Sequence, residues 1–303
     1  MQIKTLEELI IEVKKNKSKK NIVIASAADE FVLQAVSDFQ KISRLNAILV
    51  GNGDEITRTM TDHGITLREY EIYPAENDVE SAKASVQLIR EGKGDMLMKG
   101  LLSTKTFIKE ILNKRTGINK SGYFSHVGIF ESPNYTKLFG ITDAAINITP
   151  DLETKKHIIK NAVRVFLKLG IDMPKVALLA PIEKVNPKMQ STVDAAKLVE
   201  IHRSEPIEQC EIEGPMALDI AISAVAAEHK GVDSKIAGKV DILVVPEITS
   251  GNVLYKSLTY MGDARAAGIL IGADVPVVLT SRTDLPESKL YSLALGNNLC
   301  KRN

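Results

Sequence analysis

The sequence predicts an α/β protein with two α/β/α domains, built on largely parallel sheets around a cleft. Short apolar runs alternate with longer amphipathic runs, which is the pattern of βαβ units. Runs such as Ile22–Ile24 and Leu243–Val245 are apolar on both faces, so helices must cover both sides of a sheet. At 303 residues the chain is long for a single core, and two domains are therefore expected.

The predicted strands are the short apolar runs, many of which follow a turn residue or a polar residue. They cover residues 21–27, 45–51, 68–73, 95–99, 123–131, 137–142, 175–180, 207–213, 241–246, 268–271 and 277–280.

The predicted helices are the amphipathic runs between these strands. Many begin at Ser, Thr or Asp, which cap helix N-termini, or carry Pro in the first turn. Gly92 and Gly170 follow two of them, where a left-handed C-terminal cap is expected. The helices cover residues 1–13, 29–41, 54–63, 78–91, 104–112, 151–169, 187–199, 215–229, 250–261 and 286–295.

The boundary between the predicted domains lies where Glu131–Asn134 breaks the pattern. We expect the chain to return to the first domain for its last strand and helix. The first domain then comprises residues 1–130 plus 275–303, and the second comprises residues 131–274.

The composition excludes several classes of protein. A net charge of +1 gives no field that would attract nucleic acid or a membrane surface, and the chain has no Trp for base stacking. Cys210 and Cys300 stand far apart, so no disulfide framework is expected. The N-terminus lacks the features of a signal peptide, and no apolar run reaches the roughly 18 residues of a membrane span. We expect a cytoplasmic protein.

Two of the last predicted strands run directly into small polar loops. Residues 241–246 lead through Glu247 into Thr249–Asn252, and residues 277–280 lead into Ser281-Arg282. Ligands of open α/β proteins bind beyond the carboxyl ends of the strands. A guanidinium fork and a glycine at a helix N-terminus both suit an anion, so these loops predict a site for a phosphorylated ligand. The alternatives are a surface salt bridge at Arg282 and a plain helix cap at Ser250.

A third junction, Lys99-Gly100 followed by Ser103-Thr104, joins a strand to a helix. The lysine and the two hydroxyl groups could hold a second anion, or one hydroxyl could cap the helix. Lys99 follows an apolar strand, and a buried lysine needs partners. His126 lies inside a strand-like run and is a further candidate site residue.

Other ligand motifs are incomplete. Gly51-Asn52-Gly53 starts like a dinucleotide fingerprint, but position 56 is isoleucine instead of the third glycine. No phosphate-binding Walker motif occurs, and the five histidines lack the spacing of metal ligands, so no metal is expected.

Taken together and in order, several segments resemble the phosphate acetyl/butyryl-transferase family, and most of all its phosphate butyryltransferase branch. The resemblance spans nearly the whole chain. It rests on Leu97–Gly100 with Ser103-Thr104, Ser125–Val127 with Phe130-Glu131, Asp143–Asn147, Glu213–Pro215 with Leu218-Asp219, Val245–Glu247 with Gly251-Asn252, and Pro276–Arg282 with Ser288–Ala294.

The resemblance implies a fold shared with isocitrate dehydrogenase-like enzymes. It also implies a transferase that converts acyl-CoA and inorganic phosphate into acyl phosphate and coenzyme A, with CoA as a substrate and no cofactor. Homodimers or larger homo-oligomers are implied. By similarity, Arg282 holds the phosphate and Ser281 stabilises the carbonyl oxygen or the leaving phosphate. Lys99, Ser103, Thr104, His126, Glu247, Gly251 and Asn252 are the implied substrate-binding residues.

One departure concerns the general base. The acetyl enzymes carry an aspartate about two helical turns after the Ser-Arg pair, whereas Ser288 stands there in this chain, with Glu287 beside it. This departure favours the butyryl branch and leaves the base unassigned. The alternatives are a phosphate acetyltransferase, a dehydrogenase on the same fold, or a non-catalytic acyl-CoA-binding protein.

Overall fold

The computed structural model describes residues 2–119, 122–280 and 286–300. Contacts between Cα atoms group the chain into two compact units. The unit drawn mostly from the middle of the sequence, Met1–Thr5 and Ser125–Ala266, is called the central unit; the unit drawn mostly from the two outer parts of the sequence, Leu6–Phe124 and Ala267–Asn303, is called the outer unit. The predicted domains, residues 1–130 plus 275–303 and residues 131–274, stay a prediction, because a grouping of contacts does not test independent folding.

The outer unit has a mostly parallel arrangement of strands in the order β3-β2-β1-β4-β11-β10. In this order, neighbouring strands from β3 to β11 are parallel, while β10 runs antiparallel to β11. Their bounds are β1 Lys20–Ala25, β2 Leu45–Gly51, β3 Tyr70–Pro74, β4 Met96–Lys99, β10 Arg265–Ile271 and β11 Val277–Val278.

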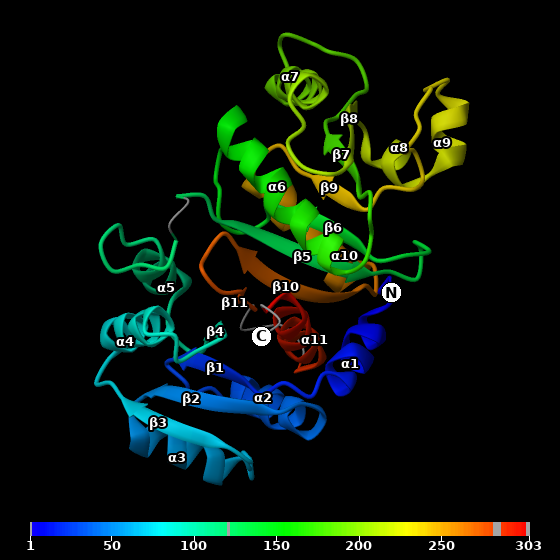
Figure 1. Cartoon of the computed structure of the whole chain (residues 1–303). Coiled ribbons are helices and arrows are strands. Elements are labelled where there is room, and N and C mark those ends of the chain that lie inside the picture. Colours follow the sequence, from blue (N-terminus) through cyan, green and yellow to red (C-terminus); the bar gives the residue numbers. More distant parts are fainter. Residues whose placement is uncertain (1, 120–121, 281–285, 301–303) are drawn as a thin grey trace. The chain divides into compact units, whose positions relative to one another are not determined.

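Helices cover both sides of these strands, as the handedness of the crossovers requires. The chain moves in one direction from β1 to β3 and back again to β4, so α2 and α3 belong on one face and α4 on the other. Accordingly α2 contacts α3, α1 and α11, whereas α4 contacts α5 (Figure 1). Their bounds are α1 Leu6–Lys15, α2 Glu30–Ile42, α3 Gly53–Asp62, α4 Asp78–Arg90, α5 Thr104–Ile111 and α11 Pro286–Leu299.

The central unit has the strand order β5-β6-β9-β7-β8, in which only the β5–β6 pair is antiparallel. The strands are β5 Ser125–Glu131, β6 Phe139–Thr142, β7 Lys175–Leu179, β8 Glu211–Met216 and β9 Ile242–Val244. The helices are α6 Leu152–Lys168, α7 Gln190–Ser204, α8 Leu218–Ile222, α9 Ala224–His229 and α10 Ile248–Met261.

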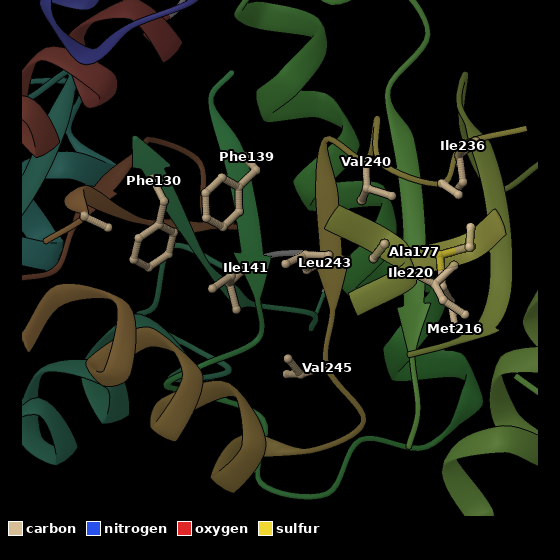
Figure 2. Packing of buried hydrophobic residues seen from close by; sticks show 14 of the residues in the cluster. Phe130, Phe139, Ile141, Ala177, Met216, Ile220, Ile236, Val240, Leu243 and Val245 are labelled. Atoms are coloured by element: carbon tan, nitrogen blue, oxygen red, sulfur yellow. The ribbon is translucent and has the colours of Figure 1, made fainter. Parts of the chain in front are cut away.

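Strand residues of the central unit alternate between two apolar layers. Phe139, Ile141 and Leu243 join one cluster with residues of α8 and α9, and side chains of α10 pack against it (Figure 2). Gly140 points the other way, toward α6, where a Cβ atom would lie only 2.7 Å from Cε2 of Phe166. Burying both faces of the strands is the main stabilising term of this unit.

The α/β class and the largely parallel strand pairing are confirmed, and most elements lie within a few residues of their predicted bounds. Gly92 and Gly170 have the expected positive φ, at 72° and 84°.

One predicted helix, at residues 215–229, is wrong. Pro215 and Met216 belong to strand β8, where Met216 pairs with Leu179 of β7. The rest forms α8 and α9, which are separated by Ser223. Its hydroxyl accepts a hydrogen bond from the N–H of Ala226 and caps α9, so its extended backbone ends α8. Strand β8 accordingly begins at Glu211 instead of residue 207.

No helix in the described part of the chain is both long enough and apolar enough to cross a lipid bilayer.

Gly100 is a position where packing demands glycine. A Cβ atom there would lie 2.2 Å from the carbonyl oxygen of Ser26 and 2.6 Å from that of Ala25. We expect Gly100→Ala to lower the free energy of unfolding by about 1–3 kcal/mol, since backbone atoms cannot move aside as a side chain can. Urea denaturation measures this change. The control is Gly53→Ala, where the nearest atom to the new Cβ is 3.7 Å away; equal losses in both variants would contradict the packing argument.

Candidate functional site

In the outer unit, the candidate residues lie at the carboxyl end of β4. The Lys99 side chain is buried, with 5% of its surface exposed, and its Nζ donates hydrogen bonds to the carbonyl oxygens of Gly100 (2.9 Å) and Leu102 (3.1 Å). The partners that a buried lysine needs therefore include carbonyl groups of its own loop. The ammonium group holds the strand-to-helix turn in shape.

Ser103 is the N-cap of α5. Its Oγ accepts a hydrogen bond from the backbone N–H of Thr106 at 3.1 Å, and it lies 2.9 Å from Oγ1 of the same residue. The capping alternative is therefore realised in the structure. Ser103 and the next residue, Thr104, are both exposed to solvent.

Strand β11 lies beside β4 in parallel, with Val277 opposite Leu97 and Val278 opposite Met98. The chain therefore leaves β11 at the same edge where Lys99 ends β4. The predicted catalytic residues Ser281 and Arg282 follow β11 in the sequence and lie outside the described residues.

The segment that carries the expected base belongs to α11. The Glu287 carboxylate accepts a hydrogen bond from the Tyr291 hydroxyl (2.8 Å), which also lies 2.6 Å from the carboxylate of Glu7 in α1. Burial, together with these two carboxylates, raises the pKa of Tyr291 well above its usual value. Glu287 thus takes part in the contact between α11 and α1. The Ser288 carbonyl accepts a hydrogen bond from the Ser292 hydroxyl.

In the central unit, the candidate residues lie on the first turn of α10, after β9. Glu247 is the N-cap, and its two carboxylate oxygens accept hydrogen bonds from the backbone N–H groups of Thr249 and Ser250, both at 2.7 Å. The sequence suggested that this helix N-terminus would bind an external anion. In the structure, the chain's own carboxylate occupies these two N–H groups.

The charge of Glu247 is favoured by this arrangement. Burial alone would raise the pKa of the carboxyl group, but the N–H groups of Ser250 and Thr249 stabilise the carboxylate by more. The net pKa lies below the ordinary value of 4.5. Glu247 is therefore an anion at neutral pH.

Gly251 is buried against the loop that follows β6. A Cβ atom there would lie 2.7 Å from the Asp143 carbonyl oxygen and 3.0 Å from Cα of Ala144. The close contact that glycine permits at position 251 is therefore made by the protein's own backbone and not by a ligand. The neighbouring Asn252 is exposed, and its Nδ2 donates to the Ala144 carbonyl at 3.4 Å.

His126 lies on β5 and is buried, with 5% of its surface exposed. Its ring packs against Tyr255 of α10, with ring centroids 5.7 Å apart and planes tilted by 57°. Its carbonyl oxygen accepts a hydrogen bond from the Thr142 hydroxyl at 2.7 Å. His126 therefore contacts α10 at Tyr255, about one turn after Asn252 on the same helix.

Asp143 directly follows the buried strand β6 and belongs to a segment that carries the family resemblance, but the sequence implied no role for it. Its carboxylate accepts hydrogen bonds from the N–H groups of Ala145 (2.9 Å), Ile146 (3.0 Å) and Asn147 (3.2 Å), and from the Asn147 side chain (2.6 Å). An aspartate between a strand and a run of small residues was the available signal, since Asp readily bonds the next backbone N–H groups.

Glu247 also borders a hollow of about 710 Å³ within the central unit. Its walls include the first turns of α6 and α7, and its lining includes Lys155 and Asp194, which form a buried ion pair at 2.7 Å. The hollow lies beside the carboxyl end of β9, where an α/β protein is expected to bind ligands.

Comparison with known proteins identifies the family of the chain. The family model described as phosphate acetyl/butaryl transferase matches residues 5–87 and 79–296. The chain therefore belongs to the phosphate acetyl/butaryl transferase family and is an acyltransferase.

Three similar proteins illustrate the relationship. A phosphate butyryltransferase of Clostridium acetobutylicum is 45% identical over 97% of each chain. A phosphate acetyltransferase of Thermotoga maritima is 36% identical over 95% of this chain and 98% of its own. The crystal structure of a branched-chain phosphotransacylase from Enterococcus faecalis V583 has a TM-score of 0.82 and 35% identity, and the match covers 92% of this chain and 98% of that one.

The Glu247 cap predicts a pH-dependent stability. Because the folded pKa lies below 4.5, the carboxylate stabilises the fold above the unfolded pKa, and this stabilisation is lost as the pH falls through the folded pKa. We expect Glu247→Gln to lower the free energy of unfolding at pH 7 by about 0.5–2 kcal/mol. The difference from wild type should disappear in acid.

Urea denaturation between pH 7 and pH 3 measures this difference. Glu200→Gln, on the exposed face of α7, is the control for removing one negative charge. A Glu247→Gln deficit that stays constant down to pH 3 would show that the carboxylate's charge has no part in the cap.

Proposed function

We propose that the protein transfers a short acyl group between coenzyme A and inorganic phosphate, with butyryl or branched short chains preferred. The observation that carries this proposal is the 45% identity to a phosphate butyryltransferase over nearly the full length of both chains. The similarity to a branched-chain phosphotransacylase of known structure adds support for the preferred acyl groups.

Written from the acyl phosphate side, the CoA thiolate attacks the carbonyl carbon, a C–S bond forms, and the C–O bond to phosphate breaks. Phosphate leaves with the electron pair of that bond. The reaction needs a base for the thiol, hydrogen-bond donors for the oxyanion, and a cation for the phosphate. We assign the phosphate to Arg282, whose guanidinium can bind two phosphate oxygens at once. Ser281 donates to the carbonyl oxygen or to the leaving phosphate.

The remaining candidate residues divide into those with side chains that face solvent and those that hold the loops in shape. Ser103 and Thr104 are exposed, as is Asn252, so their polar groups can meet a substrate. Lys99, Glu247 and Gly251 already make close contacts within their own loops. We propose that these three act mainly by fixing the positions of the exposed groups, while His126 borders the site from β5.

We further propose that acyl-CoA and phosphate are the only partners in the reaction, with no metal or prosthetic group. We also propose that the protein works in the cytoplasm as a homodimer or a larger homo-oligomer. These assignments follow the family resemblance.

The proposed reaction is tested by following CoA release from acetyl-, butyryl- and isovaleryl-CoA with and without phosphate. We expect phosphate-dependent release, with the highest kcat/KM for butyryl-CoA or isovaleryl-CoA. A preference for acetyl-CoA would make the protein a phosphate acetyltransferase. Tight CoA binding without turnover on any of these substrates would favour a non-catalytic acyl-CoA-binding protein.

The role of Arg282 is tested by Arg282→Ala. Losing hydrogen bonds from a charged group costs about 1.5–3 kcal/mol, which corresponds to a rise of about 10–100-fold in KM for phosphate. Steady-state kinetics with phosphate as the varied substrate measure the change. Arg58→Ala, an exposed residue of α3, serves as the control. An unchanged KM for phosphate in Arg282→Ala would remove this residue from the site.

A further inference from the structure

Asp143 is a buried carboxylate, with 3% of its surface exposed, and its four described side-chain partners are the backbone N–H groups of Ala145, Ile146 and Asn147 and the side-chain amide of Asn147. Removing such an acceptor leaves donors without a partner, which is costly in a buried loop. Asp143 therefore fixes the path of residues 143–147.

The same loop supports the first turn of α10. The N–H of Val245 donates to the Thr142 carbonyl at 2.9 Å, and the N–H of Ile248 donates to the Ile148 carbonyl at 3.1 Å. Three residues beyond Ile248, Gly251 packs directly on the backbone of Asp143 and Ala144.

Asn252 completes the contact between the two loops. Its side-chain amide donates to the Ala144 carbonyl at 3.4 Å. A shift of Ala144 would move the acceptor of this bond. The Asp143 carboxylate, through the N–H of Ala145, restrains the residue next to Ala144.

From these contacts we propose that Asp143 is a positioning residue of the acyl transfer reaction, which it serves by holding the loop that fixes Asn252. The inference rests on the proposed function. Asp143 itself touches no substrate in this assignment, because its carboxylate is buried and taken up by its own loop. Misplacing a substrate-contacting group by about 1 Å can cost up to about 100-fold in rate.

Asp241 offers a matched control within the same unit. It is equally buried, at 3% exposure, and its carboxylate accepts bonds from the N–H of Lys175 and from the ammonium group of Lys137. Asp241 precedes β9 at its amino end, whereas Asp143 follows the parallel strand β6 at its carboxyl end. Both replacements with Asn should destabilise the fold, but only one lies next to the candidate site.

The experiment compares wild type, Asp143→Asn, Asp241→Asn, Asn252→Ala and the double variant Asp143→Asn/Asn252→Ala. We expect Asp143→Asn to lower kcat/KM of the folded enzyme by about 10-fold or more, while Asp241→Asn lowers only the Tm. If Asp143 acts through Asn252, the kcat/KM of the double variant should be no lower than that of the less active single variant.

Hydrogen exchange on the same proteins tests the contact independently of activity. Asp143→Asn should speed exchange in peptides covering 143–150 and also in those covering 246–254, whereas Asp241→Asn should leave 246–254 unchanged. Unchanged kcat/KM in Asp143→Asn, or losses that multiply in the double variant, would overturn the positioning role in an enzyme whose wild type is active. A wild type that releases no CoA with phosphate would instead refute the proposed function and, with it, any positioning role in that reaction.

Discussion

The parallel pairing of strands is the constraint on which the rest of the structure depends. Because neighbours such as β1 and β4, or β6 and β9, run in the same direction, their carboxyl ends lie at one edge. Two parallel strands need a crossover connection between them, here a helix that covers a face, and the turn between strand and helix carries polar residues. The candidate residues at Lys99 and at Glu247–Asn252 both lie in such turns.

These turns are shaped largely by the chain's own hydrogen bonds. The Lys99 ammonium donates to carbonyl groups of its loop, and Glu247 and Asp143 accept from backbone N–H groups. Buried or half-buried charges are stable there because the backbone supplies their partners. A rigid turn leaves the exposed polar groups, such as the Asn252 amide, in fixed places. Such fixed placement is what a reaction that relies on oriented hydrogen bonds requires.

The fold was largely predictable because periodicity reports burial directly. Strand β2 and helices α2 and α4 lie close to their predicted bounds, since turn or capping residues such as Asn52, Asp29 and Asn77 border their apolar runs. Strand β7 does so because it lies between Pro174 and Pro181. The helix predicted at residues 215–229 failed for a local reason. Pro215 suits the first turn of a helix, but its neighbours pair with β7, and the Ser223 hydroxyl splits the remainder. A hydrophobic pattern does not show that the hydroxyl of one residue with an extended backbone will end one helix and cap the next.

The sequence by itself determined the α/β class, the alternation of elements, and the strand-end positions of Lys99, Glu247 and Asn252, because each depends on residues close together in the chain. Only the tertiary structure decided what these residues do. Gly251 is glycine because the Asp143–Ala144 backbone, more than a hundred positions earlier, packs on it. The N–H groups of α10 suggested a site for an external anion, but they bind Glu247. Such contacts depend on strand order and packing, which bring distant segments of the chain together. Local sequence patterns do not show which distant segments will meet.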